Sequence, residues 1–383
     1  MVQSNSRTCD VKKRNSSIEF IKVISIVLII ISHVIQTLGT NNPNIPYSDY
    51  VIDISNATSN IQYLLLALLR NFGPLGNSIF FVCSAWFLLE SKRSSNKKIL
   101  QMILDVWVIS VLLFIIVYDM RNGNLGIEMI IKQFFPTTFS NNWYITCYLI
   151  FYALHPFINI VIYRIDQSSL FRCTFVLSFL YIGCNYIVPS FFETDLILWI
   201  TIYFIIAYLK FYLPRLTKNV SLNLFFAATG LIGHICIVLF TNFLGLRFYY
   251  LHDKLLHWNK NCSPFTILLA ISIFNISQNI HFENNIINNI SRMSFLVYII
   301  HENNLLAYYY RPLLWNYVYN KFGYNWVVGW VFLLAILIFL FSLLASTIYK
   351  NTLQRFVIYF VDMVYPIWRK WYIKAESIVL QIH

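Results

Sequence analysis

The 383-residue chain is 58% hydrophobic, and only 11% of its residues are Asp, Glu, Lys or Arg. A soluble domain carries roughly 25% charged residues, so this composition excludes a water-soluble globular protein. The formal net charge is +12, but the basic residues lie in short segments between apolar runs, which is typical of membrane topology signals and not of nucleic-acid binding.

Ten apolar runs follow one another along the chain, and a membrane-spanning helix needs about 20 such residues. They predict an all-α, polytopic helical bundle with about ten transmembrane helices. The second run contains Gly73-Pro74, which predicts a short helix, a break and a second helix. The fifth, eighth and ninth runs are short or polar. The predicted spans lie near residues 18–37, 62–89, 99–118, 143–163, 172–189, 195–213, 222–243, 264–279, 293–310 and 325–348.

The distribution of basic residues favours an orientation with both termini in the cytoplasm (N-in/C-in). Most Lys and Arg residues fall in segments that this orientation places inside, as the positive-inside rule requires. The chain then divides into a cytoplasmic N-terminal segment (1–17), a transmembrane domain (18–348) and a cytoplasmic tail (349–383). Trp368 and Trp371 flank basic residues in the tail, which predicts an amphipathic helix on the membrane surface. The outer loops 38–61 and 119–142 are rich in Asn, Thr and Tyr, which fits a carbohydrate site and equally any external loop.

The first predicted span carries three ionisable residues, Glu19, Lys22 and His33, and ionisable groups inside a membrane are functional candidates. Lys22 and His33 are three helical turns apart, so they share one helix face and lie roughly 16 Å apart along the axis. Glu19 can pair with Lys22 on that face. His33, in the outer half of the bilayer, is suited to take a proton from a hydroxyl group. Two structural interpretations stay open. Lys22, paired with Glu19, could extend its charged end to the lipid head groups of the inner leaflet. His33 could be a structural histidine that is hydrogen-bonded to a neighbouring helix.

Three later segments also carry polar groups within apolar runs. Residues 80–89 read FFVCSAWFLL and include Ser84. Residues 143–159 read WYITCYLIFYALHPFIN and begin with Trp143. Residues 294–302 read SFLVYIIHE, in which Tyr298 and His301 share a helix face while the adjacent Glu302 would point elsewhere on the helix. The first of these segments is followed by a basic stretch of Lys92, Arg93, Lys97 and Lys98.

Together with the Lys-x10-His spacing in the first span, these segments resemble, in order, the motifs of the acyltransferase 3 family of membrane acyltransferases. The resemblance covers residues 18–348 and is strongest to the branch that modifies surface polysaccharides. Lys22 stands where many members have Arg, and Ala85 stands where the family usually has Gly. Lys keeps the positive charge but lacks the bidentate geometry of Arg, so a phosphate contact would be a point-charge one.

The resemblance implies a membrane-bound O-acyltransferase in the cytoplasmic membrane of a bacterium. The donor would be cytoplasmic acyl-CoA, usually acetyl-CoA, with no further cofactor. The acceptor would be a sugar hydroxyl of a surface glycan or its lipid-linked oligosaccharide precursor. It implies that His33 is the general base and that Lys22 and Glu19 are also catalytic residues. The expected substrate-binding residues are Ser84, Tyr298, His301, Glu302, Trp143, Lys97 and Lys98. For the late-span residues Tyr298, His301 and Glu302, a hydrogen bond to the catalytic histidine is the alternative to positioning the substrate.

Structural interpretations of several of these residues stay open. Ser84 fits a helix-packing hydroxyl, Lys97 and Lys98 fit a topology signal, and Trp143 fits an interfacial aromatic belt. The seven cysteines show no metal-type spacing, so we expect no metal site.

Two other functions also stay open. One is a transporter or flippase of lipid-linked sugars, since polar residues within spans also mark translocation paths. The other is a non-catalytic membrane component of a polysaccharide assembly complex. Loss of ester groups in a His33→Ala variant with intact glycan transport would favour the enzyme. The sequence indicates neither the acceptor sugar nor an oligomeric state.

Overall fold

The computed structural model describes residues 15–36, 61–91, 94–139, 142–188, 194–248, 260–322 and 326–381. Within these ranges all the regular elements are helices, which confirms the all-α prediction. Residues 1–14, nearly all of the loop 38–61, and the basic residues Lys92 and Arg93 lie outside the described residues. The helices are α1 (Ser16–Gln36), α2 (Ile61–Arg70), α3 (Phe72–Leu88), α4 (Asn96–Met120), α5 (Ile127–Phe134), α6 (Trp143–Arg164), α7 (Gln167–Ser178), α8 (Asn185–Ile187), α9 (Asp195–Tyr212), α10 (Pro214–Lys218), α11 (Val220–Arg247), α12 (Pro264–Asn279), α13 (Asn285–Ser291), α14 (Ser294–His301), α15 (Arg311–Phe322), α16 (Val327–Asn351) and α17 (Leu353–Gln381).

Eight helical stretches of the described chain are long and apolar enough to cross a membrane, so the chain is a multi-pass membrane protein. They are Ser16–Gln36, Leu64–Leu88, Asn96–Met120, Trp143–Arg164, Gln167–Ile187, Asp195–Tyr212, Val220–Leu244 and Val327–Asn351. The other two of the ten predicted spans correspond to shorter helices. Helix α12 has 16 residues, and α14 has eight.

Helix α14 is short because the chain turns immediately after it. Glu302 follows its last residue, and the side chain of Asn303 accepts a hydrogen bond from the backbone N–H of Leu305 at 3.0 Å. Asn303 also donates to Gln133 on α5 at 3.0 Å. The chain resumes as a π-helical segment, Leu306–Tyr310, and then as α15, so residues 293–310 do not form one span.

The second predicted span is interrupted, as expected, but the break lies at Asn71, just before Gly73-Pro74. The Asn71 side chain hydrogen-bonds the Thr266 hydroxyl of α12 at 3.0 Å, which fixes the break against a neighbouring helix. Pro74 then lies in the first turn of α3, where a missing backbone N–H costs nothing.

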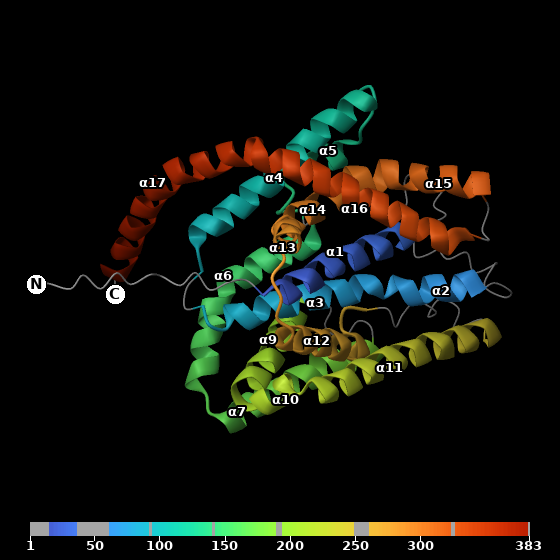
Figure 1. Cartoon of the computed structure of the whole chain (residues 1–383). Coiled ribbons are helices and arrows are strands. Elements are labelled where there is room, and N and C mark those ends of the chain that lie inside the picture. The colour runs from blue at the N-terminus through green and yellow to red at the C-terminus, as the bar shows by residue number, and fades with distance from the viewer. Residues whose placement is uncertain are drawn as a thin grey trace, which may run out of the picture.

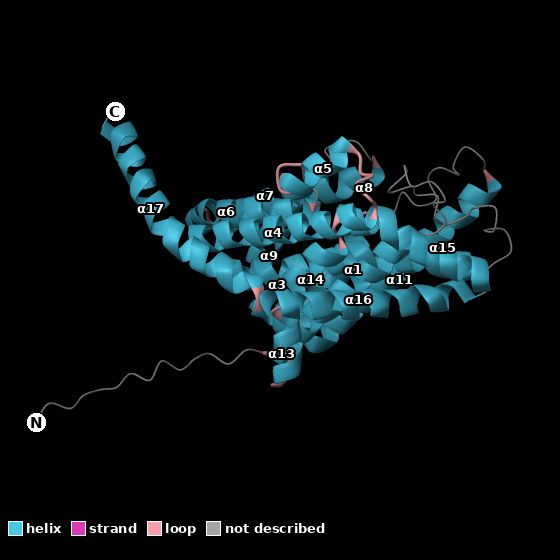
Figure 2. Cartoon of the chain, turned by 90° about the horizontal axis from the view of Figure 1, so that it is seen from above, coloured by secondary structure: helices cyan, strands magenta, loops and turns pink. Residues whose placement is uncertain are grey.

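Helix α1 lies in the interior of the bundle, in contact with α3, α12, α13, α14 and α16 (Figure 1). The polar residues of α1 therefore face protein and not lipid. Helix α17 leaves the bundle and extends away from it (Figure 2). It begins at Leu353, two residues after α16 ends. The division of the chain into an N-terminal segment, a transmembrane domain and a tail stays a prediction.

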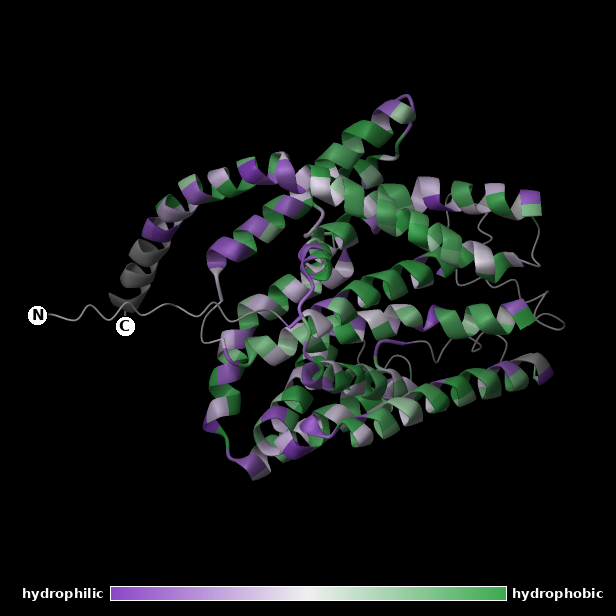
Figure 3. Cartoon of the chain, in the orientation of Figure 1, coloured by the Kyte–Doolittle hydropathy of each residue, from purple (hydrophilic) through white to green (hydrophobic). Residues whose placement is uncertain are grey.

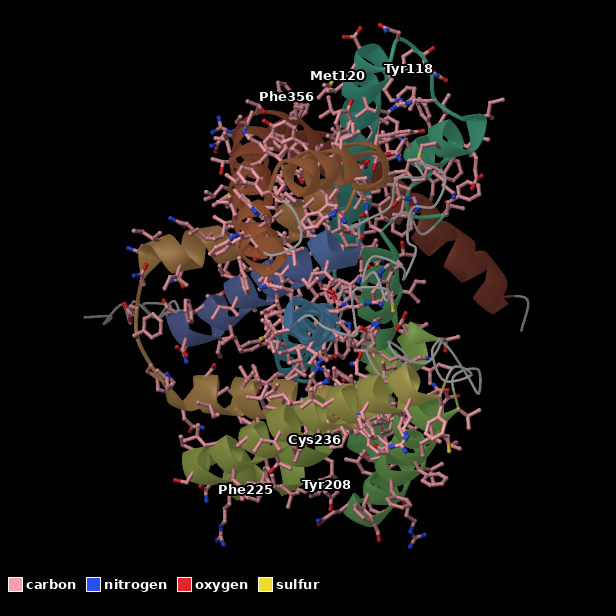
Figure 4. All side chains as sticks on the ribbon, turned by 90° about the vertical axis from the view of Figure 1, so that its right-hand side faces the viewer. Tyr118, Met120, Tyr208, Phe225, Cys236 and Phe356 are labelled. Atoms are coloured by element: carbon pink, nitrogen blue, oxygen red, sulfur yellow. The ribbon has the colours of Figure 1, made fainter. Side chains whose placement is uncertain are left out.

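The outer surface of the bundle is apolar. Hydrophobic residues run along the length of the helices (Figure 3). Large apolar side chains such as Met120, Phe225 and Phe356 project at the perimeter, where they are 63%, 64% and 71% exposed (Figure 4). An apolar surface on this scale needs a covering, and the lipid bilayer supplies it.

Two glycines of α3 let that helix approach α1 closely. A Cβ atom on Gly76 would lie 2.5 Å from the backbone oxygen of Ser25, and one on Gly73 would lie 2.6 Å from the Ser32 hydroxyl. Small residues at such contacts allow transmembrane helices to pack backbone against backbone. The α1–α3 contact therefore depends on these two positions.

Gly76→Ala is expected to destabilise the protein by about 1–3 kcal/mol, because its new methyl group must push α1 and α3 apart. Thermal unfolding of the detergent-solubilised protein measures this effect. Gly329→Ala is the matched control, because nothing lies within 4 Å of a Cβ built there. Equal melting temperatures for the two variants would contradict the close α1–α3 contact.

Candidate functional site

Two cavities lie along α1, one beside His33 and one beside Lys22. The cavity beside His33 has a volume of about 700 Å³ and is called the histidine cavity here. The cavity beside Lys22 has a volume of about 380 Å³ and is called the lysine cavity. His33 and Lys22 thus both face the interior from the same side of α1, but each lines its own cavity.

His33 forms the centre of a buried polar cluster. Its Nδ1 atom lies 2.6 Å from a carboxylate oxygen of Glu302 and 3.3 Å from Nε2 of His301. The three side chains are all buried. The helix break after α14 allows this contact. Glu302 lies beyond the last helical residue, so its carboxylate turns toward α1. The prediction that Glu302 would point elsewhere on the helix is therefore wrong.

The hydrogen bonds of the cluster assign its protons. Nδ1 of His301 lies 2.9 Å from the backbone carbonyl oxygen of Val297, which can only accept, so this nitrogen carries hydrogen. In neutral His301 the Nε2 atom is then an acceptor. His33 Nδ1 therefore faces two acceptors and carries its own hydrogen, which leaves the lone pair of neutral His33 on Nε2. A carboxylate that holds a histidine in this tautomer makes the other ring nitrogen the base.

Arg311, the first residue of α15, closes the cluster from the other side of Glu302. Its guanidinium donates to the Glu302 carboxylate at 3.2 Å and to the backbone oxygen of His301 at 2.6 Å. It also lies 3.5 Å from the backbone oxygen of His33. Both charged side chains are only 5% exposed. Arg311 therefore neutralises the carboxylate and holds it between α1 and the end of α14.

His33, His301 and Glu302 also form a set of possible metal ligands within 4.8 Å of one another. Two ligands of a tetrahedral zinc ion, each at about 2.0–2.1 Å, would lie about 3.3 Å apart. The His33–Glu302 separation of 2.6 Å is shorter and matches a charge-assisted hydrogen bond. The Arg311 cation already balances the carboxylate, so the arrangement fits a hydrogen-bonded dyad better than a metal centre.

Polar side chains line the histidine cavity. They include amides from Asn77, Asn185 and Asn261, and the carboxylate of Asp195, which accepts a hydrogen bond from Asn261 at 3.1 Å. Trp143 provides a flat aromatic surface in the same cavity. Several amides beside one aromatic ring suit a ligand rich in hydroxyl groups.

Most of the charged groups that line the lysine cavity are basic. Lys22 pairs with Glu19 at 3.5 Å, as predicted, and the Ser291 hydroxyl donates to the same Glu19 oxygen. The other cationic side chains of the lining are Lys98, Arg292 and Lys350, and the other carboxylate is Asp105. Asp105 accepts hydrogen bonds from Tyr349 at 2.8 Å and Gln354 at 3.0 Å, so it is held by the protein itself. Four cations face two held carboxylates, which suits an anionic ligand.

Residues 15–349 match a protein-family model described as an acyltransferase domain, Acyl_transf_3. The chain belongs to the acyltransferase 3 family. No match was found among curated proteins or among solved structures. Family membership and the membrane-crossing helices together identify a membrane acyltransferase.

The structure of this acyltransferase divides all but one of the residues named from sequence into two groups. Glu302 and Trp143 line the histidine cavity with His33, while His301 contacts His33 directly. Ser84, Tyr298 and Lys98 line the lysine cavity with Lys22 and Glu19. Lys97 lines neither cavity and pairs with Asp362 of α17. Ser84 donates to the backbone oxygen of Phe80 at 3.2 Å, a bond typical of a helix-packing hydroxyl.

Sequence reasoning missed Arg311, a buried charge of this acyltransferase. Arg311 follows an apolar run, a position that is typical of a residue at the membrane surface. A π-helical segment directly precedes it, and such segments are frequent at functional sites. The run of three tyrosines before Arg311 carries no sequence signal for that segment. Asp105, within the apolar run of α4, was a missed residue that its position in a span marks as a candidate.

Proposed function

We propose that this acyltransferase moves an acyl group, with acetyl the first candidate, from acyl-CoA to a sugar hydroxyl. The acceptor would be a surface polysaccharide or its lipid-linked precursor, and the enzyme would lie in the cytoplasmic membrane of a bacterium with both termini inside. The observation that supports this most directly is the buried His33–Glu302 pair at the wall of a polar cavity.

The chemistry follows from the tautomer of His33. Nε2 of His33 accepts the proton of the acceptor hydroxyl while that oxygen attacks the thioester carbonyl carbon. The new C–O bond forms, the C–S bond breaks, and the thiolate leaves with the proton that His33 had accepted. Glu302 stabilises the imidazolium that exists between the two proton transfers, as a carboxylate does beside a catalytic histidine.

The two cavities suit the two substrates of this reaction. CoA carries several phosphate charges, and the basic lining of the lysine cavity is complementary to them. This cavity lies at the end of the bundle where α17 begins, since Gln354 of α17 contributes to its wall. In the N-in/C-in orientation that end is cytoplasmic, which is where acyl-CoA is found. The amides and Trp143 of the histidine cavity would bind the acceptor sugar.

The decisive experiment compares surface glycan from a deletion strain with glycan from its complemented strain. Proton NMR detects O-acyl groups and identifies the acyl chain. We expect ester resonances that disappear on deletion and return on complementation. Identical spectra from the two strains would reject the proposed acceptor class.

Lys22→Gln is expected to raise KM for acyl-CoA by about tenfold or more with a smaller effect on kcat, because it removes a charged phosphate partner and leaves His33 intact. Steady-state kinetics of the purified enzyme over a range of acetyl-CoA concentrations measure both constants. Lys218→Gln, at an exposed position on α10, is the control for loss of one positive charge. A fall in kcat at unchanged KM would assign Lys22 a different role.

A further inference from the structure

Helices α1 and α3 line both cavities, and the two cavities follow one another along these helices. On α1, Lys22, Ile26 and Ile29 face the lysine cavity, and His33 and Gln36 continue the same stripe into the histidine cavity. These positions recur every three or four residues, so they form one continuous helix face. Among the described residues the two cavities share no lining side chain, so they are distinct cavities.

Helix α3 repeats this arrangement. Phe80 and Ser84 line the lysine cavity, while Gly73 and Asn77 line the histidine cavity. The cavities are therefore consecutive parts of one path between α1 and α3. The boundary falls between Ile29 and His33 on α1, and between Asn77 and Phe80 on α3.

Three aromatic side chains occupy this boundary. The ring of Tyr144 lies between those of Phe80 and Tyr298, with centroid distances of 6.4 and 5.6 Å. Tyr144 and Tyr298 are buried. Phe80, Tyr144 and Tyr298 all line the lysine cavity, and together they are called the aromatic partition.

The partition is joined to the catalytic side of the path. The Tyr144 hydroxyl donates to the backbone oxygen of Asn77, in the wall of the histidine cavity, at 3.3 Å. The Tyr298 ring packs edge-on against His301 at a centroid distance of 5.4 Å, and His301 contacts His33. The partition thus lies directly between the basic groups near Lys22 and the base at His33.

In the proposed reaction, the donor must reach both ends of this path. Its phosphates interact near Lys22, while its thioester carbon has to lie beside the hydroxyl that His33 deprotonates. These two positions are roughly 16 Å apart along α1. The acyl-bearing arm of the donor therefore has to pass between the rings of the partition.

We infer that the aromatic partition is the passage for the acyl arm and that it restricts the enzyme to short acyl groups. This inference rests on the proposed acyl-CoA reaction. The Tyr144 ring is in contact with both other rings, so a group that passes between them has to displace them. Close-packed protein interiors resist added volume. An acetyl group needs the smallest displacement. Each added methylene requires a wider opening, and hydrophobic sites discriminate about tenfold or more per methylene.

The test is the acyl-length preference of the full-length enzyme in lipid nanodiscs. Acetyl-CoA, butyryl-CoA and hexanoyl-CoA are supplied as donors, with unacylated glycan from the deletion strain as acceptor. Phe80→Leu is expected to raise the ratio of hexanoyl to acetyl transfer by about tenfold or more, because it replaces a ring of the partition with a smaller side chain. Tyr144→Phe keeps the ring volume but frees it from Asn77, and is expected to shift the ratio in the same direction.

Phe81→Leu provides the matched control one residue along the chain. The Phe81 ring packs in the core against Phe151 and Trp199, at 4.9 and 4.6 Å, and lines neither cavity. The Phe81→Leu variant is expected to keep the wild-type ratio of hexanoyl to acetyl transfer even if the substitution lowers stability. Melting temperatures of all three variants show that the assayed proteins are folded.

The outcomes separate the two proposals. If the wild type transfers acetyl but Phe80→Leu and Tyr144→Phe both keep its acyl-length ratio, the partition does not set the preference and the proposed function stands. A shift in Phe81→Leu equal to that in Phe80→Leu would also overturn the inference, because it would reflect general loosening. If the wild type transfers no acyl group from any of the three donors, the proposed function itself fails and the inference falls with it.

Discussion

Replacing His33 with glutamine is expected to lower kcat of acyl transfer by about a thousandfold. Glutamine retains a polar side chain of similar reach but cannot accept the hydroxyl proton, and general-base catalysis contributes about 10²–10⁴-fold. The Glu302–Arg311 ion pair does not depend on the imidazole, so the variant should fold. Initial rates with the purified protein and O-acyl content of the glycan both measure the effect.

His155→Gln is the matched control for this substitution. His155 is also a buried histidine within a membrane-crossing helix, but its Nδ1 bonds to the backbone oxygen of Tyr152 at 2.7 Å and it lines neither cavity. We expect it to keep substantial activity. Unchanged ester content in the His33→Gln strain would favour a non-catalytic component of an assembly complex, and loss of glycan export would favour a transporter.

Replacing Arg311 with methionine is expected to destabilise the fold by about 3–5 kcal/mol, because the Glu302 carboxylate would stay buried without its cation. The lost guanidinium also leaves the backbone oxygen of His301 without its donor. Denaturant unfolding of the detergent-solubilised protein measures the loss. Arg215→Met, at an exposed position on α10, should leave stability within about 0.5 kcal/mol of the wild type.

A double variant separates the structural and catalytic contributions of this ion pair. In Arg311→Met/Glu302→Gln the uncompensated charge is gone, so most of the lost stability should return. Activity should not return, because a neutral amide stabilises the His33 imidazolium less than a carboxylate does. A double variant as unstable as the single one would show that Arg311 acts by packing and not by neutralising Glu302.

Much of the site on α1 could be predicted because helix geometry is local. The spacing of Glu19, Lys22 and His33 fixes their common face wherever the helix lies, and the structure confirms the Glu19–Lys22 pair. The apolar runs likewise specify most of the membrane-crossing helices, since length and hydropathy are properties of the sequence alone.

The convergence of Glu302 on His33 could not be predicted in this way. Hydrophobicity continues on both sides of residues 302–304, so the periodicity predicts one long helix there. The helix ends because Asn303 bonds to Gln133 on another helix, a contact between residues far apart in sequence. The same holds for Arg311, whose partners Glu302 and His33 come from two other parts of the fold.

The interior position of α1 has a consequence for biosynthesis. α1 leaves the ribosome before α13 and α14 do, yet Glu19 and His33 find partners at those later helices. Glu19 bonds to Ser291, and His33 to His301 and Glu302. Until residues 291–302 have been translated, these polar groups must be sheltered by the translocation machinery or by bound water, since exposure to hydrocarbon is costly. The cluster of His33, His301 and Glu302 therefore cannot assemble before α14 has been made.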